Sequence, residues 1–265
     1  MKDAYGEMLR ELGHTETLVF SMGNESECHG GALYEDTDSY VATSAAIEAA
    51  EKTGARYAGR IPYTTDRVGE AARAWMPAYL PVEDFYSSTL GFLKPIVEYY
   101  QGISGRKPEV VIVAGHGGIP RELETVIHEA LGVDAKCVFP GADFGMHAGD
   151  EEHSLMVYLD YFSKEGLDEV QETAQREPRE ALARWPQLFG LSGYWYDEGI
   201  FDEVKKRHPY ALDGFDIDDF QMLRRPGKVE RVEAFLQDKN LRIDAQKGQK
   251  AYEGFVSDVV KAIES

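Results

Sequence analysis

Short apolar runs alternate with longer amphipathic segments along most of the chain. Runs of strand length occur at Thr17–Met22, Arg56–Ile61, Glu109–Ala114 and Lys136–Phe139, and polar turns follow them. The run Glu109–Ala114 is almost entirely apolar, which is typical of a central parallel strand covered on both faces. Strands that alternate with helices of this length predict an α/β fold with a mainly parallel central sheet flanked by helices.

Amphipathic spacing and end signals predict the helices. The predicted helices lie at residues 3–12, at 39–53 with Asp38 or Ser39 as cap and Gly54 as terminator, at Val82–Gln101, at Ile119–Gly132 with Pro120 in the first turn, through 155–162 with Glu152 already inside the helix, within 163–185 and at 246–264. No internal repeat or linker composition divides the chain. We therefore expect one domain over 1–265, with a motif-bearing core at about 14–162 and a decorated C-terminal part at 163–265.

The stretch from Pro62 to Pro81 lacks a regular pattern. It contains three prolines and several aromatic residues, which predicts an irregular loop. Tyr63, Trp75 and Tyr79 could line a pocket there, or they could pack beneath the loop without contacting a ligand.

Composition limits the partners. With 28 Lys and Arg against 47 Asp and Glu, the formal net charge is −19, which repels nucleic acid and anionic membranes. The two cysteines indicate free thiols rather than a disulfide framework. No apolar run is long enough for a membrane span, and the first residues lack the apolar core of a signal peptide. We expect a cytoplasmic protein that acts on a small molecule.

Candidate metal ligands gather after the first predicted strand. Glu27, His29 and Asp38 lie within twelve positions. If the chain leaves the strand extended, Glu27 and His29 point to one side and Cys28 points to the other. Two carboxylates and an imidazole suit a divalent metal ion. Acidic residues are abundant in this chain, so such a cluster also arises by chance.

Two later segments carry further candidate residues. His116 is flanked by glycines directly after the apolar strand at Glu109–Ala114, where an imidazole needs a partner. His147 precedes the helix that contains Glu152. Because ligands bind at the carboxyl ends of parallel strands, these groups can converge at one edge of the sheet. A phosphate-binding loop is disfavoured because the glycines around His116 lack the lysine and spacing of that motif.

Together the three segments resemble the creatininase family of metal-dependent hydrolases. That family carries an E-x-H-G segment followed by T-D, then G-H-G-G after a strand, then H-A-G-x-x-E opening a helix. The matching residues here are Glu27–Gly30 with Thr37 and Asp38, Gly115–Gly118, and His147–Glu152. The resemblance also extends to Asp244–Gly248, which is similar to the start of the family's last helix.

This resemblance implies a three-layer α/β/α fold and a site with two divalent ions, either Zn or Mn. By the resemblance, the metal ligands would be Glu27, His29, Asp38, His116 and Glu152, with Asp38 bridging the ions. His147 would handle protons as a catalytic residue, and Glu152 would belong to the catalytic set as well. Relatives form homo-oligomers, often hexamers, and the aromatic segment Gly190–Phe201 is a candidate subunit contact.

Four positions depart from the family pattern. Gly118 replaces a glutamate, Ala32 replaces a histidine, Ile119 replaces an asparagine and His153 replaces a threonine. The glycine favours Glu152 as the last ligand. We expect the other three to alter the pocket, which makes creatinine itself a doubtful substrate.

The implied activity is hydrolysis of a small, polar, cyclic or compact carbonyl compound, in which a metal-bridged hydroxide attacks the carbonyl carbon. Cleavage of a cyclic amide or formamide C–N bond is one outcome. Ring-opening C–C hydrolysis of an inositol-derived diketone such as 3-dehydro-scyllo-inosose is the alternative. An inactive structural or binding member of the family is a third reading. The sequence leaves the substrate, the metal and the oligomer number open.

Overall fold

Four parallel strands form the centre of the molecule. The structure is a computed structural model that describes residues 16–145, 147–185, 198–207 and 242–265 and the single positions 214, 218 and 237. The strands are β1 (Thr17–Met22), β2 (Arg56–Ile61), β3 (Glu109–Ala114) and β4 (Ala135–Val138). Their order is β2-β1-β3-β4 and all pairs are parallel, which confirms the predicted sheet.

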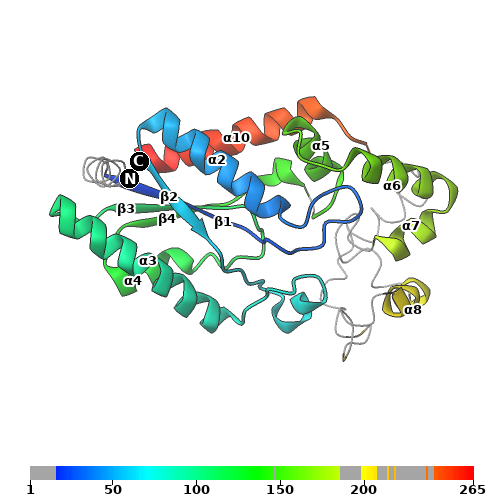
Figure 1. The fold of residues 1–265 in the computed structure, drawn as a ribbon, viewed down its shortest axis with the longest axis horizontal. Coiled ribbons are helices and arrows are strands. Elements are labelled where there is room, and N and C mark those ends of the chain that lie inside the picture. The colour runs from blue at the N-terminus through cyan, green and yellow to red at the C-terminus, as the bar shows by residue number, and fades with distance from the viewer. Residues whose placement is uncertain are drawn as a thin grey trace, which may run out of the picture.

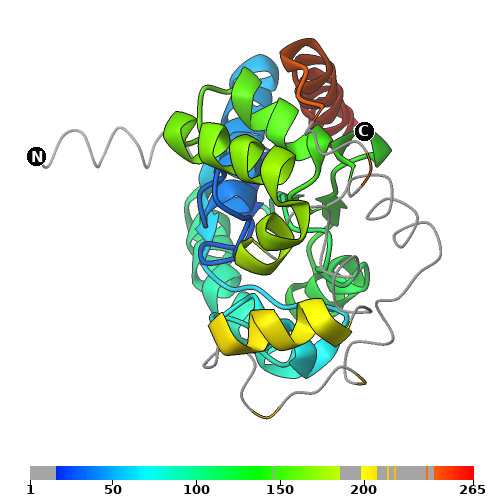
Figure 2. The same ribbon diagram turned by 90° about the vertical axis from the view of Figure 1, so that its right-hand side faces the viewer.

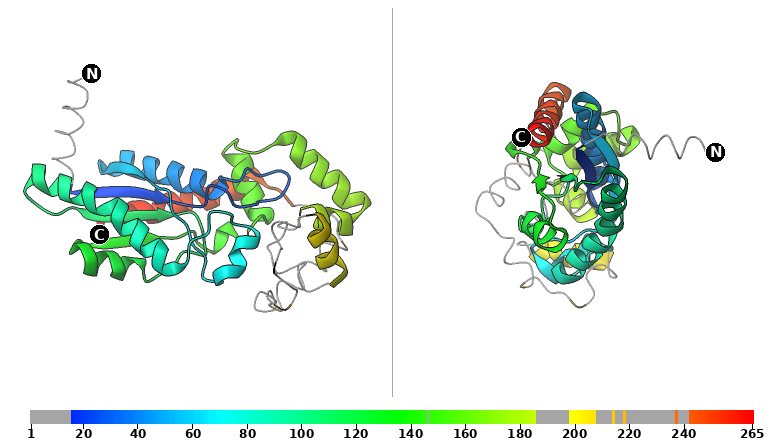
Figure 3. Two further views of the ribbon diagram at one scale, coloured as in Figure 1. Left: turned by 60° about the horizontal axis from the view of Figure 1, so that its bottom comes forward. Right: turned by 90° about the vertical axis from the view of Figure 1, so that its left-hand side faces the viewer.

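Helices cover both faces of this sheet. On one face lie α2 (Thr37–Thr53), α5 (Asp150–Tyr158) and α10 (Ala245–Glu264), and on the other lie α3 (Val82–Ser104) and α4 (Leu123–Leu131) (Figure 1). The end-on view in Figure 3 shows the three layers, with the sheet in the middle. The predicted α/β/α arrangement is confirmed.

The part of the chain after residue 162 is helical where the structure describes it. It forms α6 (Lys164–Arg176), α7 (Pro178–Arg184) and α8 (Glu198–Arg207), beyond the carboxyl ends of the strands (Figure 2). The predicted helix at 3–12 and most of the segment Gly190–Phe201 lie outside the described residues. No helix in the described part of the chain is long and apolar enough to cross a membrane.

The two faces of the sheet are packed by different kinds of residues. On one face α2 itself contributes small side chains, among them Ala42, Ala45 and Ala49, whereas α5 and α10 contribute larger ones such as Met156 and Phe255. The face under α3 and α4 is filled by large ones such as Phe85 and Leu93. Small residues let α2 approach the strands closely, whereas large residues fill a wider space.

Two helix starts differ from the prediction. Asp38 lies inside the first turn of α2 and does not cap it, because the helix already begins at Thr37. Gly54 ends this helix with φ 74°, as expected of a left-handed terminator. On the other face, α4 begins at Leu123 and not at Ile119, because Ile119 first turns into the core beneath α3.

The loop at Pro62–Pro81 is irregular apart from one short 3-10 helix, η1 (Gly69–Ala74). Trp75 lines the pocket described below, whereas Tyr63 packs against the core under α3. Tyr79 is buried and is not among the residues that line the pocket. A second 3-10 helix, η2 (Ala142–Phe144), follows β4.

Candidate metal centre

The loop after β1 carries the first two candidate ligands. Glu27 and His29 are buried, whereas Cys28 between them is exposed, so the predicted alternation along this segment is confirmed. The side-chain amide of Asn24 donates to Glu27 Oε2 at 3.2 Å. His29 Nδ1 donates to the carbonyl of Glu27 at 3.0 Å, which leaves its Nε2 directed at the site.

Asp38 reaches the site from the first turn of α2. Its backbone is so close to the turn after β3 that a Cβ on Gly115 would lie 2.1 Å from the carbonyl oxygen of Asp38. Gly23, directly after β1, faces the first turn of α2, and a Cβ on it would lie 2.4 Å from the amide nitrogen of Ser39. Glycine at these two positions is therefore required for the helix to bring Asp38 to the strand ends.

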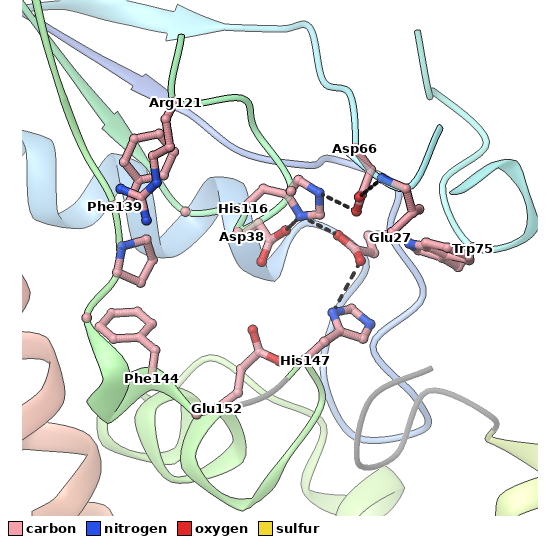
Figure 4. A pocket seen from close by; sticks show the side chains of 17 residues that line it. Glu27, Asp38, Asp66, Trp75, His116, Arg121, Phe139, Phe144, His147 and Glu152 are labelled. Carbon is pink, nitrogen blue, oxygen red and sulfur yellow. Dashed lines mark hydrogen bonds and ion pairs between the residues drawn. The ribbon is translucent and has the colours of Figure 1, made fainter. Parts of the chain in front are cut away.

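The ring of His116 lies at the centre of the carboxylates. Its Nδ1 is 2.9 Å from Asp38 Oδ2 and 3.0 Å from Glu27 Oε2. Its Nε2 is 3.2 Å from Asp66 Oδ2. Figure 4 shows the ring between Asp38 and Asp66, with Glu27 next to it.

Asp66 is a site residue that the sequence analysis missed. It comes from the irregular loop at Pro62–Pro81, and its Oδ1 also accepts a hydrogen bond from the amide of Val68 at 2.9 Å. A Cβ on Gly118 would lie 2.4 Å from Asp66 Oδ2, so the glycine leaves the space that this carboxylate uses. The sequence signal for a change here was Gly118, which stands where the creatininase pattern has a glutamate. This exchange does not indicate which distant residue fills the space that the missing side chain leaves.

Glu152, in the first turn of α5, and His147, in the turn before this helix, complete the cluster. His29 Nε2 lies 3.8 Å from Glu152 Oε1 and 3.4 Å from Asp38 Oδ1. The amide of Ala148 donates to Glu152 Oε2, and Ala148 has a φ of 49°. A non-glycine residue in this conformation is held there by its surroundings, here next to the cluster.

The histidine His147 faces the same cluster. Its Nδ1 is 3.2 Å from Glu27 Oε1, and its Nε2 is 2.9 Å from the carbonyl oxygen of Cys28. Since a carbonyl only accepts, Nε2 carries a proton and donates it. All six residues implied by the resemblance are therefore close together.

The charges in this cluster are strongly coupled. Burial would lower the pKa of His29, but the carboxylates of Glu152 and Asp38 outweigh this effect and raise the pKa to about 10. Burial opposes ionisation of Asp38 as well, yet hydrogen bonds from His116 and His29 hold the pKa of Asp38 well below its usual range. Burial raises the pKa of Glu152. The buried carboxylates thus favour positive charge next to them.

The donor atoms fit divalent cations. Two groups of three ligands have all their donor atoms within 4.8 Å of one another, and Asp38 belongs to both. One group is Glu27, Asp38 and His116, and the other is His29, Asp38 and Glu152. His147 forms a third such group with Glu27 and His29. Carboxylate and imidazole ligands in this proportion suit Zn or Mn.

The cluster forms part of the wall of a pocket of about 290 Å³. The rest of the wall comes from the loops after β2, β3 and β4, with Trp75, Arg121, Phe139 and Phe144 as its large side chains (Figure 4). The predicted effect of Ala32, Ile119 and His153 on this pocket stays a prediction. All three are buried and none of them belongs to the pocket lining.

Helices α6 and α7 support the loop that carries His29. A Cβ on Gly31 would lie 2.4 Å from Nε1 of Trp185, which follows α7, and a Cβ on Gly166 in α6 would lie 2.1 Å from the carbonyl oxygen of Gly31. The amide of Ser163 donates to the carbonyl of Ala32 at 2.8 Å. Part of the segment after residue 162 therefore packs directly behind the site.

The chain is similar to known proteins in structure, whereas its sequence gives no match. No protein-family model and no curated protein matches the sequence. Among solved structures, a crystal structure of creatinine amidohydrolase (creatininase) superposes with a TM-score of 0.53 at 16% sequence identity, covering 98% of this chain and 93% of that chain.

Two further creatininase structures give similar values. A Zn–Zn form of a creatininase variant has a TM-score of 0.52 at 16% identity, and a manganese form has 0.50 at 17% identity. Each covers 98% of this chain and 94% of that chain. The resemblance inferred from the three sequence segments is confirmed at the level of architecture: this chain has the creatininase fold.

Proposed function

We propose that this chain is a metal-dependent amidohydrolase that hydrolyses a C–N bond in a small, polar, cyclic or compact carbonyl compound. The observation that carries the proposal is the pair of three-residue ligand groups that share Asp38. The pocket of about 290 Å³ next to them has the size of a small-molecule site. Zn and Mn forms among structures of the same fold, and a creatininase variant complexed with creatine, support the same class.

The residues present fit two divalent ions. Glu27, Asp38 and His116 would hold one ion, and His29, Asp38 and Glu152 would hold the other. When bound, such ions supply an acidified water and polarise a carbonyl group. The remaining chemistry depends on how the chain orients these ligands and moves protons.

His116 is oriented by Asp66. Its Nε2–H donates to Asp66 Oδ2, which leaves the Nδ1 lone pair directed at Glu27 and Asp38. A carboxylate behind a ligand histidine fixes its tautomer and raises its basicity. Glu152 is oriented in the same way by the amide of Ala148, which occupies its second oxygen.

His147 has the geometry of a proton carrier. Its Nε2–H is held by the carbonyl of Cys28, so Nδ1 is the nitrogen that can exchange a proton with the pocket. It would deliver that proton to the leaving nitrogen when the C–N bond breaks. No other described side chain that lines the pocket combines a titratable nitrogen with this partial exposure.

The proposal is tested by metal analysis together with a hydration assay. Purified protein is analysed for bound metal by mass spectrometry, then incubated with a cyclic amide, a formamide and a keto-inositol diketone, with added Mn or Zn and again after chelation. Water addition to the amide or formamide that is lost on chelation supports the proposal. Turnover of the diketone alone would assign C–C cleavage instead, and a protein without bound metal would contradict both.

A further inference from the structure

Within the described residues, one arginine and no lysine lines the pocket. Among the residues that line it, the acids are Glu27, Asp38, Asp66 and Glu152, whereas Arg121 is the single lysine or arginine. Arg121 lies in the turn between β3 and α4, and its side chain is exposed. In Figure 4 it lies on the opposite side of the pocket from Glu27 and His147. The pocket therefore has a carboxylate-rich side and a cationic side.

The guanidinium of Arg121 is held by stacking and not by a carboxylate. Its Cζ lies 3.7 Å from the centroid of the Phe139 ring, which follows β4. Within the described residues it has no ion pair. Other described arginines do, among them Arg60 with Glu25 at 2.9 Å and Arg106 with Glu16 at 2.6 Å. The chain has 47 acids, yet none of those in the described residues pairs with this arginine at the pocket wall.

Stacking prepares this group for an anion. A guanidinium that lies flat on an aromatic ring keeps its N–H donors at the edge free, and their fork matches a carboxylate. Bidentate contacts of this kind are among the stronger hydrogen bonds in proteins. Phe139 and Phe144 lie on the same side of the pocket as Arg121 in Figure 4, and they would cover the carbon chain between two polar ends of a ligand.

We propose that Arg121 binds a carboxylate on the substrate, remote from the carbonyl group that reacts at the metal ligands. The substrate class is thus a small amide or other carbonyl compound that also bears a carboxylate. This inference rests on the proposed function, because the carboxylate cluster attracts the reacting carbonyl only when cations occupy it. It explains how a chain with a net charge of −19 accepts an anionic molecule.

The inference is tested with simple acids as probes. Malonate, succinate and glutarate are compared with propanoate, butanoate and pentanoate by isothermal titration calorimetry on the metal-loaded protein. Each pair has the same number of carbons and differs in the second carboxylate. We expect at least one dicarboxylate to bind about 10- to 100-fold more tightly than its partner, as is typical of a charged hydrogen-bonded pair.

The variants assign this difference to one residue. Arg121→Gln is expected to reduce the dicarboxylate advantage to about threefold or less and to leave monocarboxylate binding unchanged. Arg121→Lys is expected to retain part of it, because lysine keeps the charge and loses the fork. Arg106→Gln is the matched control, since it removes the same charge at an exposed position that does not line the pocket. It should bind as the unmodified protein does.

The outcomes separate the two proposals. Metal content and melting temperature are measured on every variant, and Arg121→Gln should match the unmodified protein in both. Bound metal without a dicarboxylate advantage, or an advantage that survives in Arg121→Gln, would overturn the role of Arg121 and leave the proposed function intact. A protein that binds no metal would overturn the proposed function and this inference with it.

Discussion

The two faces of the sheet are packed differently, and they therefore differ in how they respond to a change of residue. On one face α2 packs through alanines, next to larger side chains from α5 and α10, and backbone lies against backbone at Gly115 and Asp38. Under α3 and α4 the space is filled by side chains such as Phe85 and Leu93. Close backbone contact leaves no room for adjustment, whereas a core of large side chains repacks when one of them changes.

The helices that carry candidate ligands lie on one face of the sheet only. Asp38 comes from α2 and Glu152 from α5, and both helices lie on the same face of the sheet. The helices on the opposite face, α3 and α4, carry none of the five expected ligands, although the turn between β3 and α4 provides both His116 and Arg121. Metal ligands must be held within a fraction of an ångström, and the tightly packed face offers that precision. The other face contributes stability, so changes on the two faces should have different consequences.

The largest effect is expected from Asp38→Asn. Asparagine keeps the size of the side chain and removes the charge shared by both ligand groups. We expect both ions to be lost and turnover to be abolished, an effect beyond the roughly 10- to 100-fold that is typical of residues behind the ligands. Metal stoichiometry by mass spectrometry and the hydration rate measure this. Full activity with two bound ions would exclude the shared site.

Gly115→Ala tests the close approach directly. The added methyl would meet the carbonyl oxygen of Asp38 at 2.1 Å, so α2 must move. We expect a loss of more than about 4 kcal/mol in unfolding free energy, together with loss of metal. Gly117→Ala is the control two positions away, because a Cβ there has no atom within 4 Å. Equal behaviour of the two variants in urea unfolding would contradict the argument.

Leu93→Ala tests the opposite face. Leu93 is fully buried in α3, and its truncation should cost about 3 kcal/mol through lost burial and the cavity left behind. Metal content should remain that of the unmodified protein, since Leu93 is not among the residues that line the pocket. Loss of metal in a folded Leu93→Ala protein would show that the two faces are not independent.

The smallest effect is expected from Asp66→Asn. Asparagine can still accept from the amide of Val68 and so keep the turn, but it removes the negative charge opposite His116 Nε2. We expect about 10- to 100-fold weaker binding of one ion, the one held by Glu27, Asp38 and His116, and little change at the other. Calorimetric metal titration should resolve the two sites. Identical titrations for both proteins would remove Asp66 from the site.

The local order of the chain was predictable from the sequence. Strands β1 and β3 follow from short apolar runs, and Gly54 ends its helix because only a residue that tolerates positive φ closes that turn. The burial of Glu27 and His29 with Cys28 exposed follows from the two-residue period of extended backbone. These features depend on neighbours in the sequence, so the sequence contains their cause.

Contacts between distant segments were decided by tertiary structure alone. Asp66 occupies the space left by Gly118, although the two residues are far apart in the chain, and Trp185 packs on Gly31 from a segment whose role the sequence did not indicate. The stacking of Arg121 on Phe139 depends likewise on two loops that meet only in the folded protein. Periodicity and spacing determine which face a residue occupies within its own element. They do not determine which residue of another element it meets, because that depends on how all the layers pack together.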